Sequence, residues 1–273
     1  MNSNKEFNLS KTFISLQREA GLAAEMLASG TTLLLKANSS QAGYYNQAFF
    51  NISIGFERLL KLIFILHFYN ENEEFPDNQA LRDYGHDLKN LLSKVRAIAE
   101  INGVSISSSD IKNDIIAFLS RFSMKTRYYN LNYISGDNSF EDPIKDWYQV
   151  VSKIKLSEKL KKRACTQSEM IEILLGEVSF ARGTTESGQA IDGIGKMTHN
   201  KMMMSSKNKE GRIVILQIVR DLTELICAIS CKISKKPSKD GMPIVPYMSE
   251  FFHIFRNDDR FLKGRKALSI YRP

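Results

Sequence analysis

The stretch "NISIGFERLLKLIFIL", residues 51–66, is the part of the sequence that says most about the fold. It belongs to a longer segment, residues 42–69, that is apolar on most of its faces. A helix that is apolar all round is buried by its neighbours rather than lying on the surface. The sequence therefore predicts a long central helix that other elements cover on several sides.

Apolar residues recur at helical spacing in most other segments, and strand-like alternation is scarce. These patterns predict an all-α protein. Gly30 is a candidate break within the first predicted helix. Around the central helix, the predicted helices cover residues 10–36, 86–101, 110–122, 143–162, 166–178, 209–234 and about 247–256.

Turn-forming residues divide the chain. The stretch "NENEEFPDN" (70–78) ends the central helix, and "SGDNSFEDP" (135–143) is the clearest break in mid-chain. The Gly- and Thr-rich stretch at 182–195 predicts an exposed loop. We therefore divide the chain into a helical bundle at residues 1–137 and a helical extension at residues 138–273.

The bulk composition is that of a globular protein, with 43% hydrophobic and 25% charged residues in a chain of 273. Three cysteines make no disulfide framework, and no metal-ligand spacing or phosphate-binding glycine motif is present. The first residues hold no apolar signal core, and the longest apolar run is too short for a bilayer. The sequence thus predicts a soluble, cytoplasmic protein without a cofactor or a membrane contact.

The positive charge is unevenly distributed. Residues 1–140 carry 14 Lys/Arg and 14 Asp/Glu, whereas residues 141–273 carry 24 and 16, which accounts for the whole net charge of +8. A basic half attracts polyanions such as RNA, although a solvated Lys-rich surface without a partner has the same composition. The predicted nucleic-acid-binding residues are Lys235, Lys236, Lys239, Arg260, Lys263, Arg265 and Lys266, with Tyr271 as a stacking residue.

The central helix carries a line of polar residues. Ser53, Glu57 and Lys61 are spaced by four, so they share one face of an otherwise apolar rod. Glu57 before Lys61 is the favourable order for an ion pair. Charges on a buried helix cost several kcal/mol unless they are paired. Other polar groups are therefore expected to face this line.

Two stretches hold such groups. In "GHDLKNLL" (85–92), His86 stands at a helix start and can reach across to a carboxylate. In "TRYYNLNYI" (126–134), Arg127, Tyr129 and Asn130 place a guanidinium, a phenol and an amide together. The alternatives are that His86 only caps a helix, that Glu57 and Lys61 form a structural ion pair, and that 126–134 is a packed turn.

These features, taken in order, resemble the HEPN family of helical domains. The resemblance covers residues of about 10–135 and rests on Glu57 and Lys61, on the stretch at 85–92, and on the Arg-containing segment that follows. It implies an α-helical bundle that often forms a homodimer. Many HEPN proteins are metal-independent ribonucleases of toxin–antitoxin and antiphage systems, while others bind nucleotides or partner proteins such as an antitoxin.

The chain departs from the ribonuclease pattern of that family, in which an Arg is followed by four to six residues and then by His. Asn132, not His, lies five residues after Arg127. We therefore expect His86 to meet Arg127 in space. In a divergent ribonuclease, His86 would be the acid or base, Arg127 would stabilise phosphate charge, and Tyr129 and Asn130 would orient RNA. A non-enzymatic module for dimerisation or nucleotide binding is the alternative.

Overall fold

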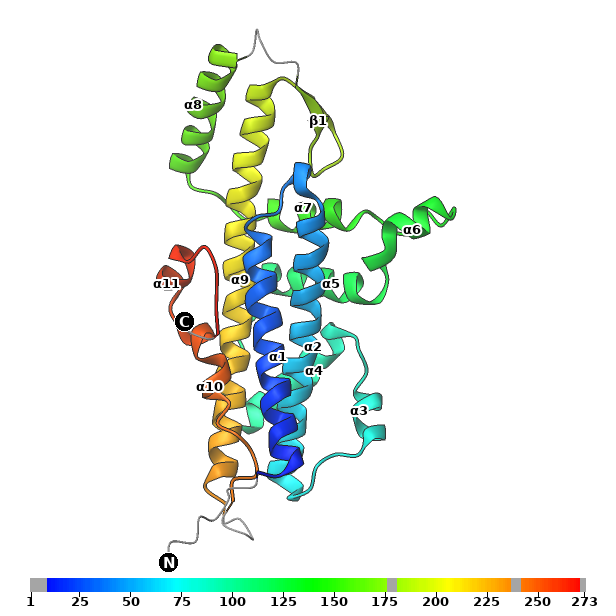
Figure 1. Cartoon of the computed structure of the whole chain (residues 1–273), viewed down its shortest axis with the longest axis vertical. Helices are drawn as coiled ribbons and strands as arrows, with labels where there is room; N and C mark the ends of the chain where they lie inside the picture. Colours follow the sequence, from blue (N-terminus) through cyan, green and yellow to red (C-terminus); the bar gives the residue numbers. More distant parts are fainter. Residues whose placement is uncertain (1–8, 176–180, 237–241, 271–273) are drawn as a thin grey trace, which may run out of the picture.

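The computed structural model describes residues 9–175, 181–236 and 242–270, and its fold is all-α, as the sequence predicts. The helices α1 (Lys11–Leu34), α2 (Gly43–Asn72) and α9 (Ile194–Ser234) lie side by side along the length of the molecule (Figure 1). The buried residues of α2 form a broad face along the whole helix, and α1, α4, α5 and α9 pack against it. This burial on several sides confirms that the stretch at 51–66 forms the centre of the fold.

Shorter elements surround these long helices (Figure 1). They are α3 (Asn78–Tyr84), α4 (Leu88–Ile101), α5 (Asp110–Met124), α6 (Tyr129–Ile134), α7 (Pro143–Ser152), α8 (Glu158–Leu175), α10 (Ser249–Phe252) and α11 (Asp259–Gly264). The chain also forms short 3₁₀ turns, which are η1 (Ser39–Gln41), η2 (Thr126–Tyr128) and η3 (His253–Arg256). A small antiparallel pair consists of β1 (Arg182–Thr184) and β2 (Ala190–Asp192).

Two glycines let α1 and α2 approach closely. A Cβ on Gly30 would lie 2.7 Å from Ile52, and a Cβ on Gly55 would lie 2.7 Å from Leu27. Each glycine thus makes room for an aliphatic side chain of the other helix. The predicted break at Gly30 is wrong, because α1 runs through this residue as a regular helix. Its missing side chain serves packing rather than a turn.

Helix α9 begins at Ile194, well before the predicted start at residue 209. Asn208 of α9 bonds to Tyr45 near the start of α2, and Lys236 after α9 bonds to Asn70 near its end. The two helices are therefore parallel, and about the first 12 residues of α9, roughly 18 Å, extend beyond the start of α2. Helix α8 packs beside this extension, and together they form the α8–α9 arm (Figure 1).

The stretch at 182–195 is not the exposed loop that its composition predicts. Residues 182–184 pair with residues 190–192, and the turn between them carries Glu186, which is only 3% exposed. Its carboxylate accepts hydrogen bonds from the Ser39 amide at 2.9 Å and from Asn200 Nδ2 at 2.8 Å. Buried carboxylates need such donors, and the hairpin supplies a partner to two other elements.

One hydrophobic core joins residues from both sides of the predicted boundary at 137/138. Trp147 of α7 is fully buried, and its ring lies 5.5 Å from that of Phe49 and 5.3 Å from that of Phe118. The division into two domains stays a prediction. Among the described helices, none combines the length and the apolar character that a membrane crossing needs.

Candidate functional site

The polar line on α2 is present in the structure. Ser53 is buried and donates a hydrogen bond to the Leu119 carbonyl of α5 at 3.3 Å. One turn later, Glu57 accepts from Lys61 Nζ at 2.9 Å, and the two side chains are only 18% and 21% exposed. The line therefore begins in the core and ends at the surface, where charges can be partly solvated.

His86 reaches this line from the turn between α3 and α4. Gly85 has a φ of +83°, a backbone conformation that favours glycine, and it redirects the chain after α3. The Nδ1 atom of His86 then lies 2.8 Å from Oε1 of Glu57, while the His86 side chain is 75% exposed. Among the described residues, Nε2 has no hydrogen-bond partner, so Glu57 orients a ring whose other nitrogen is open to solvent.

Asp87, the neighbour of His86, is a helix cap. Its carboxylate accepts from the Lys89 amide at 2.9 Å at the start of α4 and from Ser120 Oγ at 2.6 Å. The hydrogen bond from Ser120 and those from the backbone hold the pKa of Asp87 below its usual range. Asp87 thus fixes the turn that presents His86 and does not itself contact Glu57 in the structure.

Lys61 and His86, the two partners of Glu57, line an open hollow of about 330 Å³ between α1, α2 and α3. Its charged lining consists of Glu19, Arg58, Lys61, Arg82 and His86. Arg58 is bound to Glu19 at 2.6 Å. Arg82 is exposed, and within the described part of the chain no carboxylate lies within ion-pair distance of it. The hollow therefore offers one guanidinium whose donors are available to an anion.

The predicted meeting of His86 and Arg127 is wrong. Arg127, Tyr129 and Asn130 line a different hollow, of about 360 Å³, together with Asn46 near the start of α2. Asn46 and Glu57 are 11 residues apart, roughly 16 Å along the helix. The Arg127 guanidinium lies 4.9 Å from the centre of the Tyr128 ring. The structure thus brings Glu57, Lys61 and His86 together and leaves Arg127, Tyr129 and Asn130 elsewhere.

The predicted nucleic-acid-binding residues form two separate groups. Lys235 and Lys236 follow the end of α9, whereas Arg260, Lys263, Arg265 and Lys266 lie in or after α11. Buried Arg212 fastens α11 to the middle of α9 by donating to the Leu262 and Arg265 carbonyls at 3.0 and 3.2 Å. Residues 212 and 235 are 23 apart, roughly 34 Å along a helix.

Two of these cations already interact with other side chains of the protein. Lys263 forms an ion pair with Glu210 at 3.0 Å, and Arg265 lies 4.6 Å from the centre of the Phe261 ring. Arg260 and Lys266 are exposed. Lys239 and Tyr271 lie outside the described residues. The predicted residues thus do not make one continuous basic surface.

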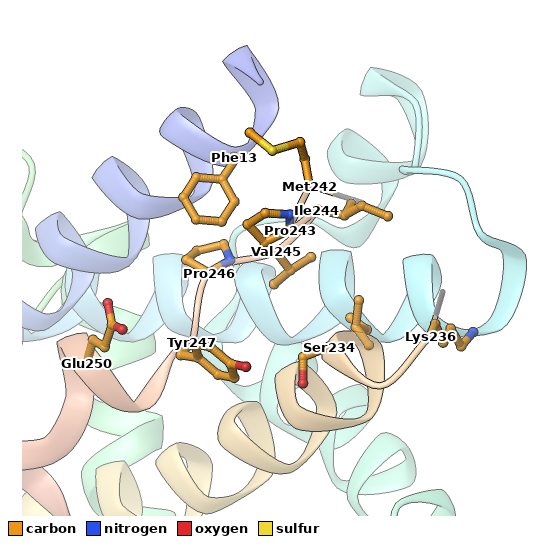
Figure 2. Close-up of a pocket in the computed structure, with 11 residues that line it drawn as sticks. Phe13, Ser234, Lys236, Met242, Pro243, Ile244, Val245, Pro246, Tyr247 and Glu250 are labelled. Atoms are coloured by element: carbon orange, nitrogen blue, oxygen red, sulfur yellow. The ribbon is translucent and has the colours of Figure 1, made fainter. Parts of the chain in front are cut away.

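Lys236 borders a third hollow, of about 370 Å³, which Figure 2 shows between the start of α1 and the segment after α9. Phe13, Val245, Pro246 and other apolar side chains line most of it. The Lys236 ammonium donates to the Asn70 carbonyl, so its charge ties the end of α9 to the end of α2. This hollow therefore offers a ligand mostly apolar contacts, because the Lys236 ammonium is already bound to Asn70.

The densest positive charge lies on the α8–α9 arm, which our sequence reasoning missed. Six of the eleven residues in "KIKLSEKLKKR" (153–163) are Lys or Arg, against one Glu. The run contains exposed Lys155, Lys159, Lys161, Lys162 and Arg163. Counting charge in short windows would have found this run, whereas halving the chain concealed it.

No three His, Cys, Asp or Glu side chains gather as metal ligands would within residues 9–175, 181–236 and 242–270. A comparison of the chain with protein-family models, with curated protein sequences and with solved structures found no match. The HEPN resemblance therefore stays a prediction, and function is inferred from the side chains of this chain alone.

Proposed function

We propose that this protein acts on RNA and that the Glu57–His86 pair is its acid–base site. The observation that carries the proposal is the 2.8 Å contact between His86 Nδ1 and Glu57 Oε1 beside an open hollow. A carboxylate that accepts from one imidazole nitrogen fixes the tautomer and leaves the other nitrogen as a base. Lys61 and Arg82 add positive charge at the same place.

The pair suits cleavage of an RNA phosphodiester. Nε2 of His86 takes the proton of the ribose 2′-hydroxyl, and the 2′-oxygen attacks phosphorus. The bond from phosphorus to the 5′-oxygen breaks, and that oxygen takes a proton from water. The products are a 2′,3′-cyclic phosphate and a free 5′-hydroxyl. Arg82, rather than the predicted Arg127, would face the charge that develops on the phosphoryl oxygens.

Charge and resemblance support an RNA substrate. The net charge of +8 attracts polyanions and makes their binding sensitive to salt. The HEPN resemblance adds a ribonuclease of a bacterial defence or toxin system and a homodimer to the proposal. These two additions rest on the resemblance alone.

A non-enzymatic dimerisation or nucleotide-binding module is the second candidate. It is favoured by the separation of Arg127 from His86 and by the Lys61–Glu57 ion pair, which shares the oxygen that His86 contacts. In that case the three side chains would only join α2 to the turn after α3. The two candidates differ in whether His86 changes the rate of a reaction or only the stability of the turn.

The test is cleavage of an end-labelled single-stranded RNA by the wild type and by His86→Gln, with His253→Gln as the matched exposed-histidine control. We expect His86→Gln to slow cleavage by about 10²–10⁴. RNA binding by fluorescence anisotropy should change less than about twofold, because His86 is one contact among many phosphate contacts.

Two further comparisons locate the site. An RNA with a 2′-deoxy sugar at the cleaved position should remain intact, since it lacks the nucleophile. Arg82→Ala should slow cleavage more than Arg127→Ala, because only Arg82 lines the hollow of His86. An intact RNA with wild-type protein, or equal rates for wild type and His86→Gln, would contradict the ribonuclease. The non-enzymatic module would then lead.

A further inference from the structure

The outward surface of α8 is unlike that of any long helix in the bundle. Among its 18 described residues only Ala164 is buried. Met170, Ile173 and Leu174 in its second half are 57%, 83% and 66% exposed. Large aliphatic side chains at this exposure, three and four residues apart, form a contiguous apolar patch that the described chain leaves open to water.

The first half of α8 is basic. The cations that lie in or just before it, all exposed, are Lys155, Lys159, Lys161, Lys162 and Arg163. Glu158 is the acidic residue nearest to them, and Lys161 binds it at 2.7 Å. The surface therefore has two parts in line, a basic half and an apolar half whose large exposed side chains are aliphatic. Exposed Glu169 lies within the apolar half, whereas Glu172 accepts a hydrogen bond from the Gly195 amide of α9. The centres of the two halves, near residues 159 and 173, are roughly 21 Å apart along the helix.

We infer that this outward face of α8 docks a protein partner that presents an acidic segment next to an apolar one. Charge complementarity selects the acidic segment, and the exposed aliphatic patch selects the apolar one. To span the two halves, the partner needs about 14 residues as a helix or about six as an extended strand.

The arrangement disfavours the other occupants. Helices that lie in a membrane surface separate apolar and basic residues around the axis, whereas α8 separates them along it. RNA would use the basic half, but bases stack on aromatic rings and not on Met170, Ile173 or Leu174. Only a partner with an acidic segment next to an apolar segment can contact both halves of the surface at once.

A second copy of this chain also fits poorly. Two α8 helices paired in parallel would bring the five cations of each copy against each other. Paired antiparallel, they would place the charged half of each copy on the apolar half of its neighbour. Like-charge contact and the burial of unpaired charge are both costly. The partner is therefore a protein of a different sequence.

The docking surface and the proposed acid–base site are separate. Asn208 lies level with Tyr45, so Glu57 is about 12 residues, roughly 18 Å, further along the bundle. Helix α8 packs on α9 in the direction away from Glu57 (Figure 1). A partner on α8 therefore leaves the hollow of His86 open, and the two proposals stand or fall independently.

The probe is a pair of labelled 20-residue peptides of one composition. In the first, Asp and Glu fill one half and Leu and Ile the other, while in the second the two classes alternate. We expect the full chain to bind the first at least tenfold more tightly in fluorescence anisotropy. Ile173→Asn with Leu174→Asn should weaken that binding at least tenfold, and Lys161→Glu with Lys162→Glu should also remove its salt dependence.

Matched controls come from other exposed positions. Leu131 and Ile134 of α6 are 63% and 80% exposed, so Leu131→Asn with Ile134→Asn controls for the loss of surface aliphatic groups. Lys235→Glu with Arg260→Glu controls for charge. All four double variants change exposed side chains and should keep the melting temperature of the wild type, which circular dichroism checks.

Several outcomes would overturn the inference. They are equal affinity for the two peptides, no binding of either, and equal effects of the α6 and α8 variants. Tighter binding of an RNA oligonucleotide or of anionic phospholipid vesicles, lost in the α8 variants, would assign the surface to that ligand instead. A dimer in light scattering that Ile173→Asn with Leu174→Asn dissociates would assign it to a second copy.

Discussion

Asn208 and Glu57 are each the centre of a polar cluster on a long, mostly buried helix, but their surroundings differ. Asn208 is fully buried. Its side chain accepts from Trp147 Nε1 at 2.9 Å and donates to the Ala37 carbonyl and the Tyr45 hydroxyl at 3.1 Å. Burial raises the pKa of Tyr45 well above its usual range, so the hydroxyl stays protonated.

The cluster around Glu57 is open on one side. Glu57 and Lys61 are mostly covered, but His86 is 75% exposed and completes the cluster from a turn. The two types of cluster therefore differ in what they can do. A closed cluster, in which each group satisfies another, joins helices and has nothing to offer a ligand. An open one keeps a nitrogen that can exchange a proton with a bound molecule.

Asn208→Ala is the strongest way to test the closed cluster. It leaves the Trp147 indole and the Ala37 carbonyl without their partner and removes one partner of the Tyr45 hydroxyl, and each unsatisfied buried group costs about 1–3 kcal/mol. We expect the free energy of unfolding to fall by about 3 kcal/mol or more in urea denaturation. RNA binding by the folded variant should be unchanged.

Asn130→Ala is the matched control, because Asn130 is an exposed asparagine in α6. It should change the free energy of unfolding by less than about 0.5 kcal/mol. A loss below about 1 kcal/mol for Asn208→Ala would show that water replaces the amide. The contrast with the open cluster would then disappear.

Glu57→Gln tests the open cluster and should have the opposite profile. Ion pairs that water reaches contribute about 1 kcal/mol or less, so the free energy of unfolding should change little. The neutral amide no longer stabilises a charged imidazole, so RNA cleavage should slow at least tenfold. Unfolding and cleavage are measured on one preparation. If Glu57→Gln lowered the free energy of unfolding as much as Asn208→Ala does, the result would show that the open cluster has a structural role.

The smallest effect concerns the cap beside His86. The hydrogen bond from Ser120 is the largest cause that holds the pKa of Asp87 below its unfolded value of about 3.9. A group with a lowered folded pKa stabilises the protein above about pH 4, and this stabilisation is lost as the pH falls through the folded pKa. Ser120→Ala should therefore cost about 1 kcal/mol or less at pH 7, with the difference from wild type shrinking below about pH 4.

Urea denaturation at a series of pH values measures this difference. Ser139→Ala is a matched control, because Ser139 Oγ donates to the Asp137 carboxylate in a fully exposed pair. It should have no measurable effect at any pH. A constant difference between Ser120→Ala and wild type from pH 3 to pH 7 would show that Ser120 acts through packing rather than through the charge of Asp87.

The helical fold, the central position of the stretch at 51–66 and the need for polar groups opposite Glu57 and Lys61 all follow from the sequence alone. The first two follow from periodicity, because a helix places residues three and four apart on one face whatever lies around it. The third follows from the desolvation free energy, because a half-buried carboxylate and ammonium group need other polar groups as partners. Each of these properties depends on residues that lie close together in the sequence.

The positions of Arg127, Glu186 and the outward face of α8 depend on how distant parts of the chain pack together. Arg127 follows α5, and the packing of α5 on α2 places it at the hollow of Asn46, a residue roughly 16 Å from Glu57 along α2. Glu186 is buried because Ser39, 147 residues away in the sequence, and Asn200 of α9 converge on its hairpin. The outward face of α8 is open because α9 covers its other side. Each outcome depends on which distant faces meet, and a local pattern holds no information about that.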